Sequence, residues 1–340
     1  MKTCLIIRLS SFGDVLLTLP VLSYLSRGEV PVKPVLVTKS QFLPWFAHLD
    51  GILVYGVKET RRFSGIGGLF RLARELISKF DPDIVIDLHQ VIRTRILNNY
   101  FLLAGIPVYR IIKGRREKKR YLNKKEVKKL PHTVDRYIDT FRRAGIEIDP
   151  VVLPFHPFYK RVLPIKNEGR PYRIGFAPFA RHKAKVWPMK QAAQLIERMS
   201  HELHAEIFLF GGIEDRSMAS QLPDGKGIIS LVGQNNPGAE LLKIADLDIM
   251  ITMDSGNMHL ASLMGVPTIS IWGGTHPDLG FRPYNQPDEY LIQAPDGTVE
   301  CRPCSVFGNR PCTRKESPYE CLTIIDSDRV YEKVRQILHE

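Results

Sequence analysis

Short apolar runs alternate with amphipathic stretches along the first half of the chain. Apolar runs typical of buried strands lie at 4–9, 34–38, 51–57, 83–88 and 108–112. Between them, apolar residues recur at helical spacing at 15–25, 69–80 and 93–104. Strands that alternate with helices predict a parallel, doubly wound α/β sheet.

A second alternation follows a proline-rich stretch at 150–171, which we interpret as a linker. The strands predicted beyond it are 172–177, 206–211, 228–232, 247–252, 268–272 and 290–293. The helices predicted between and after them are 188–203, 214–221, 238–245, 257–264 and 328–338. The pattern therefore predicts two doubly wound halves, with a ligand site in a cleft between them.

The composition of the chain bears on where the protein is located. The chain has 340 residues, 44% of them hydrophobic and 25% charged, as in ordinary globular proteins. No apolar run approaches the roughly 20 residues of a membrane-spanning helix, and the start of the chain does not resemble a signal peptide. We therefore expect a cytoplasmic protein, either free or resting on the inner face of the cytoplasmic membrane.

The positive charge is concentrated in one segment. Formal net charge is +12, and residues 113–129 hold ten Lys or Arg against two Glu. One interpretation is a solvated loop or helix face. The other is a patch for an anionic partner, such as a phosphorylated glycolipid, an anionic membrane or a nucleic acid.

The first candidate for chemistry is Asp14. It stands where a turn that follows the first strand enters a helix, and in open α/β sheets ligands bind outside the carboxyl ends of strands. An aspartate in this place can also cap the helix. Both interpretations are open from position alone.

Three turns of the second half also follow predicted strands. They are 178–188 with several cations, 254–259 with the sequence DSGNMH, and 273–277 with the sequence GGTHP. Small residues and a helix N-terminus favour phosphate, so the turns predict a nucleotide diphosphate site. Asp254 could alternatively cap its helix.

Four of the five cysteines cluster near the C-terminus, at Cys301, Cys304, Cys312 and Cys321. A CxxC unit with two further cysteines permits a four-thiolate structural zinc site. Free thiols in a loop are the other main interpretation, and disulfides are disfavoured in the cytoplasm.

Four segments together resemble glycosyltransferase family 9, whose best-known members are ADP-heptose:lipopolysaccharide heptosyltransferases. They are SSFGDVLLTLP at 10–20, KVWP at 185–188, DSGNMHLA at 254–261 and WGGTHP at 272–277. The resemblance implies a GT-B fold, in which two Rossmann-like, doubly wound parallel-sheet domains face a central cleft. It places the acceptor on residues 1–160 and the nucleotide sugar on 161–325, with a final helix at 326–340 packing back on the N-terminal domain.

The resemblance also implies an inverting transfer of a sugar, heptose from ADP-heptose, to an anionic lipopolysaccharide core, without a required cofactor. Asp14 matches the proposed general base, and Lys185 matches the residue that neutralises the diphosphate. Asp254 matches a contact to the sugar hydroxyls, and Glu214 or Asp215 a contact to the ribose. The remaining donor-site or cleft-loop residues implied are Ser255, Gly256, His259, Gly273, Gly274 and Thr275. The chain departs from the family upstream of Lys185, where Ala180 and Arg181 replace hydroxyl residues that hold phosphate, and we expect Arg181 to substitute as a cation.

Acceptor contacts are expected from the first turn and from the basic segment with the helix after it: Ser11, Gly13, Arg116, Lys119, Arg120, His132 and Arg136. Two alternatives keep the fold: a family 9 transferase with another nucleotide sugar, or a sugar-nucleotide epimerase. A non-enzyme alternative is a polyanion- or nucleic-acid-binding protein that uses 113–129. No recognised nucleic-acid motif accompanies that segment, so a nucleic-acid partner is not expected.

Overall fold

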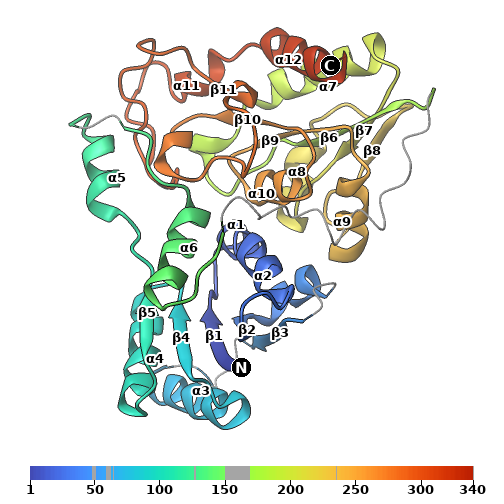
Figure 1. Ribbon diagram of the computed structural model, residues 1–340. Helices are drawn as coiled ribbons and strands as arrows, with labels where there is room; N and C mark the ends of the chain where they lie inside the picture. Colours follow the sequence, from blue (N-terminus) through green and yellow to red (C-terminus); the bar gives the residue numbers. More distant parts are fainter. Residues whose placement is uncertain are drawn as a thin grey trace. The chain divides into compact units, whose positions relative to one another are not determined.

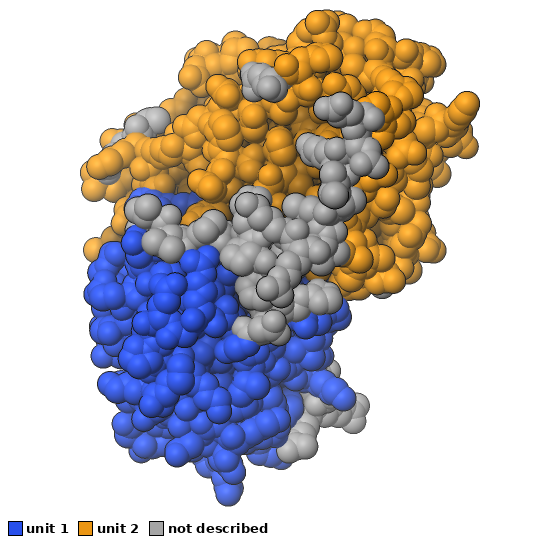
Figure 2. All heavy atoms as spheres, turned by 45° about the vertical axis from the view of Figure 1, so that its right-hand side comes forward, with its two compact units in different colours: residues 1–114, 131–158 blue, residues 115–130, 159–340 orange. Residues whose placement is uncertain are grey.

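The computed structural model describes residues 1–47, 51–58, 63, 65–125, 128–149, 169–234 and 236–339. These residues form two compact units, one of residues 1–114 with 131–158 and one of residues 115–130 with 159–340 (Figure 2). The expected domain boundary at residue 160 and the expected linker up to residue 168 lie outside the described residues. Among the described helices, none is both long and apolar enough to cross a membrane.

Unit 1 is built on a five-stranded sheet in the order β3-β2-β1-β4-β5, with every neighbouring pair parallel (Figure 1). Its strands are β1 Lys2–Ile7, β2 Val32–Lys39, β3 Leu53–Val57, β4 Ile84–Asp87 and β5 Val108–Arg110. Its helices are α1 Phe12–Leu16, α2 Leu19–Ser26, the 3-10 helix η1 Ser40–Phe46, α3 Gly65–Phe80, α4 Ile92–Leu103 and α6 Thr133–Arg143.

The core of unit 1 explains its apolar pattern. Leu5 and Ile7 of the central strand β1 are fully buried, because sheet neighbours and helices cover both faces. Helix α3 buries Leu72 and Leu76, four residues apart on one face.

Unit 2 is built on a six-stranded parallel sheet in the order β11-β10-β9-β6-β7-β8 (Figure 1). Its strands are β6 Tyr172–Ala177, β7 Ala205–Leu209, β8 Ile228–Ser230, β9 Ile249–Met253, β10 Thr268–Trp272 and β11 Leu291–Gln293. Its α-helices are α5 Arg115–Leu122, α7 Met189–Glu202, α8 Arg216–Ala219, α9 Pro237–Ala245, α10 Gly256–Leu263, α11 Glu320–Thr323 and α12 Ser327–His339. Its 3-10 helices are η4 Lys183–Lys185, η5 Ile213–Asp215, η6 Pro277–Leu279 and η7 Asp288–Tyr290.

Each sheet has one point where the strand order reverses. In unit 1 this point lies between β1 and β4, and in unit 2 between β6 and β9. Loops that leave these adjacent strands diverge to opposite faces of the sheet and open a crevice at its carboxyl edge. The turns with Asp14 and Asp254 follow β1 and β9, so the structure places both at these points.

The basic segment differs from expectation, because its helix α5 belongs to unit 2 and not to the N-terminal domain. Side chains explain this placement. The ammonium of Lys118 lies 4.0 Å from the centroid of the Phe281 ring, and Lys129 forms an ion pair with Asp288 at 3.0 Å. The expected domain of residues 1–160 is therefore interrupted by residues 115–130.

The last helix, α12, belongs to unit 2 and packs against α7. The expected packing of this helix on the N-terminal domain stays a prediction. Helix α12 buries Val330, Tyr331 and Val334, and the guanidinium of Arg198 from α7 lies 3.8 Å from the centroid of the Tyr331 ring. Apolar burial and this cation–π contact account for its position.

The predicted helix at 15–25 is in fact two helices, α1 and α2. Pro20 is the second residue of α2, where its missing N–H is tolerated, but it could not lie within one continuous helix without losing a hydrogen bond. The break keeps α1 short and leaves Asp14 in its first turn.

Candidate active site

Asp14 is the third residue of helix α1, and Ser11 holds the N-cap position. The interpretation of Asp14 as the N-cap is therefore wrong. The hydroxyl of Ser11 instead donates a hydrogen bond to Oδ2 of Asp14 at 2.6 Å. The backbone carbonyl of Asp14 accepts a hydrogen bond from the hydroxyl of the buried Tyr137 on α6 at 3.0 Å, which connects the turn to the core of unit 1.

A buried arginine lies against this carboxylate. Nη2 of Arg8 is 2.6 Å from Oδ2 of Asp14, and Arg8 is 5% exposed. Burial is the largest single influence and opposes the charge, but Asp14, Tyr137 and Asp87 together outweigh it, so the pKa of Arg8 is raised. The fixed positive charge stabilises the ionised form of Asp14, which is the form that can accept a proton.

His89 completes the group, although the sequence analysis did not single it out. It follows β4, and its Nε2 lies 3.4 Å from the hydroxyl of Ser10, which follows β1. Burial and the nearby charges of Arg8 and Lys113 lower the pKa of His89 to about 3, so its ring is neutral at physiological pH. The reversal point of unit 1 thus carries an ionised carboxylate and a neutral imidazole.

In unit 2 the central feature is an ion pair. Nζ of Lys185, at the end of η4, lies 2.8 Å from Oδ2 of Asp254, which follows β9. The hydroxyl of Thr275 donates to the same oxygen at 2.8 Å, and Asp254 is 8% exposed. The interpretation of Asp254 as a helix cap is wrong, because Ser255 occupies the N-cap of α10 and Asp254 binds these two side chains instead.

Glycines allow the 273–277 turn and the segment near Gly308 to approach the 178–188 turn closely. The N–H of Gly274 donates to the carbonyl of Ala184 at 2.8 Å. A Cβ on Gly273 would lie 2.6 Å from that carbonyl oxygen, and one on Gly308 would lie 2.7 Å from the Lys185 chain. A larger residue at Gly273 would therefore press against the backbone of the 178–188 turn, and one at Gly308 would press against the Lys185 side chain.

The other predicted donor residues lie around the same edge of the sheet. Gly256 and the buried His259 lie on α10. Asp215 accepts from the N–H of Gly212 at 2.8 Å, which occupies one of its oxygens, and the neighbouring Glu214 is exposed. Arg181 is exposed and forms no ion pair with a described residue.

The predicted acceptor residues are divided between the two units, and their joint role stays a prediction. Arg116, Lys119 and Arg120 are exposed on α5 of unit 2, whereas His132 and Arg136 lie on α6 of unit 1. His132 has a structural task, because its Nδ1 accepts from the N–H of Val134 at 3.2 Å as the N-cap of α6. Arg136 is buried and donates to the carbonyl of Ile112.

The four C-terminal cysteines are free thiols, so the structure does not support disulfides. Burial raises the pKa of Cys321 to about 11 and also raises that of Cys304, so both are protonated at neutral pH. Among the described residues, no group of three or more His, Cys, Asp or Glu is arranged to hold a metal ion. The zinc interpretation of these cysteines is therefore not confirmed.

The chain thus has two parallel doubly wound sheets, with a lysine–carboxylate pair at the reversal point of one and a carboxylate at that of the other. Residues 69–306 match the family model of glycosyltransferase family 9 (heptosyltransferase). The chain belongs to this family.

Named relatives agree with the family model. The chain is 30% identical over 181 residues to lipooligosaccharide heptosyltransferase 2 of Haemophilus ducreyi, a match that covers 51% of this chain and 49% of that protein. It is 23% identical to lipopolysaccharide heptosyltransferase 1 of Pseudomonas aeruginosa over 98% of this chain and 97% of that one. The first match thus spans about half the length of the relative, and the second nearly all of it.

Solved structures show the same fold. The structure of Escherichia coli ADP-heptose lipopolysaccharide heptosyltransferase II superposes with a TM-score of 0.70 at 20% identity, covering 100% of this chain and 99% of that chain. The predicted α/β class with two Rossmann-like sheets is confirmed. The cleft expected between them stays a prediction.

Proposed function

We propose that this chain is an inverting heptosyltransferase that moves heptose from ADP-heptose to a sugar of an anionic lipopolysaccharide core. The observation that carries the proposal is the Lys185–Asp254–Thr275 cluster at the reversal point of unit 2, within the segment that matches the family. The relatives named as lipopolysaccharide heptosyltransferases support the choice of sugar and acceptor.

The residues of unit 2 bind the parts of the nucleotide-sugar donor. Lys185 neutralises the diphosphate, on which charge builds up as the bond to the sugar breaks, and a fixed cation is most effective there. The N-terminus of α10, with Ser255 and Gly256, offers N–H groups to the same phosphates. Asp254 holds hydroxyls of the sugar, and Glu214 holds the ribose.

Asp14 is the general base of the proposed reaction. It takes the proton from the acceptor hydroxyl as that oxygen forms a bond to the anomeric carbon from the side opposite the leaving group. The bond from the anomeric carbon to the phosphate oxygen breaks, and its electron pair leaves with ADP. Lys185 supplies the positive charge, so the scheme requires no metal ion. We place the reaction at the inner face of the cytoplasmic membrane, where a glycolipid acceptor would be available.

A thermal-shift series with ADP, UDP and GDP tests the donor part of the proposal. A ligand that binds only the folded protein raises the melting temperature by mass action. We expect a shift with ADP and with ADP-heptose, and none with UDP or GDP at the same concentration. A shift with UDP or GDP alone would keep the reaction class and overturn the assigned sugar nucleotide. No shift with any nucleotide would overturn the proposed function.

A further inference from the structure

A cavity of about 250 Å³ lies in unit 2, separate from the Lys185–Asp254 pair. Its wall combines Tyr121 and Lys124, from helix α5 and the turn after it, with His276 and Arg302 from distant parts of unit 2. Ala294, Pro295, Val299 and Pro303 form apolar parts of the wall. At about 30 Å³ per water molecule, the cavity has the volume of about eight waters, which exceeds a simple ion and suits one sugar ring.

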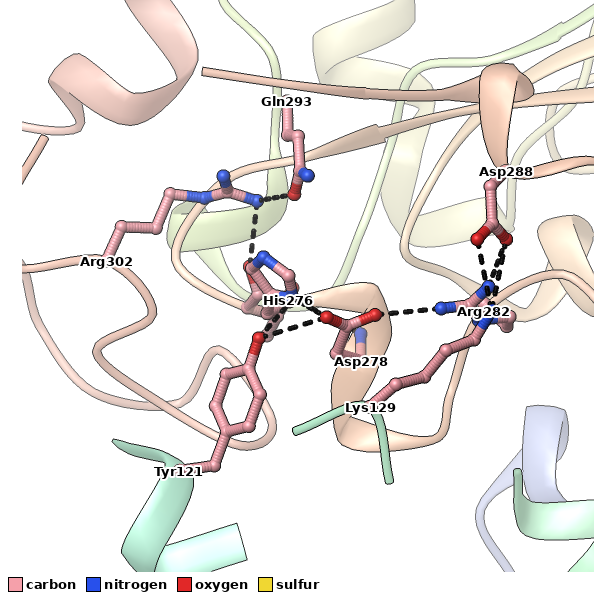
Figure 3. A network of polar contacts seen from close by, with 9 residues as sticks. Tyr121, Lys129, His276, Asp278, Arg282, Asp288, Gln293 and Arg302 are labelled. Carbon is pink, nitrogen blue, oxygen red and sulfur yellow. Dashed lines mark hydrogen bonds and ion pairs between the residues drawn. The ribbon is translucent and has the colours of Figure 1, made fainter. Parts of the chain in front are cut away.

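Arg302 brings a positive charge that no described carboxylate pairs within ion-pair distance. Its Nε donates to the carbonyl of Gly273 at 2.7 Å, and its Nη2 donates to Gln293 at 2.6 Å and to the carbonyl of Thr275 at 3.3 Å. Nη1 has no hydrogen-bond partner among the described residues (Figure 3). Burial lowers the pKa of Arg302, as expected for a charge that the protein compensates incompletely.

The rings of Tyr121 and His276 also line the cavity, and His276 can donate a hydrogen bond from Nε2. Nδ1 of His276 accepts from the N–H of Asp278 at 3.2 Å and lies 3.0 Å from the hydroxyl of Tyr121 (Figure 3). Burial and Arg302 lower the pKa of His276 to about 4, so the ring is neutral and its proton is assigned to Nε2. The tilted Tyr121 and His276 rings, 5.5 Å apart, form a surface for the apolar face of a sugar.

The cavity adjoins the candidate donor site through one residue. Thr275 donates its hydroxyl to Asp254 and offers its carbonyl to Arg302. A group bound at Arg302 would therefore lie beside the residue assigned to the transferred sugar. Asp296 is the one acid in the wall; it is exposed, and its charge acts on Arg302, His276 and Tyr121.

We propose that this cavity binds a sugar of the acceptor that carries a carboxylate or phosphate, with Arg302 and Lys124 holding the anionic group and His276 donating to a sugar hydroxyl. The assignment to the acceptor rests on the proposed function. It gives helix α5 a role different from the one its charge suggested, because Tyr121 builds the wall and only Lys124 of the basic residues reaches it.

Calorimetric titrations of the full-length protein with glucuronate, glucose 6-phosphate, glucose and inorganic phosphate test the site without any transfer assay. We expect the two anionic sugars to bind, also in saturating ADP, and glucose and phosphate to bind at least about five-fold more weakly. Lys124→Asn should weaken anionic sugars about five-fold and Arg302→Lys about ten-fold. Asparagine suits residue 124, whose φ is 54°.

Lys226→Asn is the matched control, because Lys226 is an exposed loop lysine of the same unit outside the cavity. Anionic sugars that bind equally to Lys124→Asn and to the wild type would overturn the site, as would displacement by ADP. Inorganic phosphate binding as tightly as glucose 6-phosphate would overturn its assignment to a sugar.

Each failure has its own signature. If ADP binds but the anionic sugars do not, the cavity proposal fails and the proposed function stands. If the anionic sugars bind in the cavity and no nucleotide binds, the proposed function fails with its assignment of the sugar to an acceptor, and the cavity stands as a site for anionic sugars. In a transfer assay, glucose 6-phosphate should compete with the acceptor, and competition with ADP-heptose would contradict the proposal.

Discussion

Replacing Lys185 by methionine should lower the free energy of unfolding and also weaken the binding of ADP, and the two effects can be measured separately. Its ammonium lies 2.8 Å from Asp254, and the two side chains are 15% and 9% exposed. Breaking a fully buried pair costs about 3–5 kcal/mol, because one charge remains uncompensated. Here some water reaches both groups and Thr275 still donates to Asp254, so we expect a loss of about 2 kcal/mol.

The same change should weaken ADP. A hydrogen bond to a charged group contributes about 1.5–3 kcal/mol, which corresponds to roughly ten- to hundred-fold in Kd. Asp254→Asn should act in the opposite sense, since it frees Lys185 for the diphosphate and leaves ADP affinity unchanged or higher. Calorimetric titration with ADP and urea unfolding of the same samples measure both effects.

Two further variants make this prediction refutable. Lys183→Met removes an exposed lysine of the same short helix and should change neither stability nor ADP affinity by more than about 0.5 kcal/mol. The double variant of Lys185→Met and Asp254→Asn should regain most of the lost stability, because no buried charge is left alone. Equal ADP weakening in Asp254→Asn and Lys185→Met would refute the assigned role of Lys185.

Three more predictions concern unit 1. Asp14→Asn should lower turnover at least about 100-fold and leave ADP affinity within two-fold; since it also deprives Arg8 of its anion, the folded fraction is measured alongside, and a matching loss of ADP binding would contradict a role as base. Burial lowers the pKa of His89 from 6.5 in the unfolded chain to about 3 in the folded protein, so the unfolded state binds more protons between these values and stability rises with pH there. Urea midpoints between pH 4.5 and 7 should therefore change less in His89→Gln than in the wild type, and an unchanged slope would count against the buried neutral ring. His132→Ala should cost about 1 kcal/mol as a lost N-cap and spare the acceptor KM; a raised KM with full stability would restore His132 as an acceptor contact.

The parallel sheets and the turns at their reversal points could be predicted because both leave local patterns. The apolar run 268–272 coincides with β10, and the run 4–9 overlaps β1, which begins and ends two residues earlier. The turns after β1, β6, β9 and β10 could be predicted for the same reason, since proline, glycine, aspartate or serine interrupts the apolar run that precedes it. The motifs assign both Lys185 and Asp254 to the donor site, and the structure pairs the two side chains.

What could not be predicted depends on contacts between distant residues. The bond between Tyr121 and Asp278 joins positions 157 apart, so no local pattern assigned helix α5 to unit 2. Arg302 lies between two cysteines, and its neighbours Gly273 and Gln293 come from other segments. Arg8 left one visible signal, a charge within the apolar run 4–9, but nothing in the sequence indicated that it pairs with Asp14.

The central claim is the transfer itself, and mass spectrometry of a single reaction tests it most directly. The purified chain is incubated with ADP-heptose and a deacylated lipopolysaccharide core oligosaccharide that lacks heptose, beside the Asp14→Asn variant. The account predicts an acceptor that gains one heptose with release of ADP, and a loss of this product in the variant. ADP-heptose left intact, or consumed by hydrolysis with no gain on the acceptor, would contradict it.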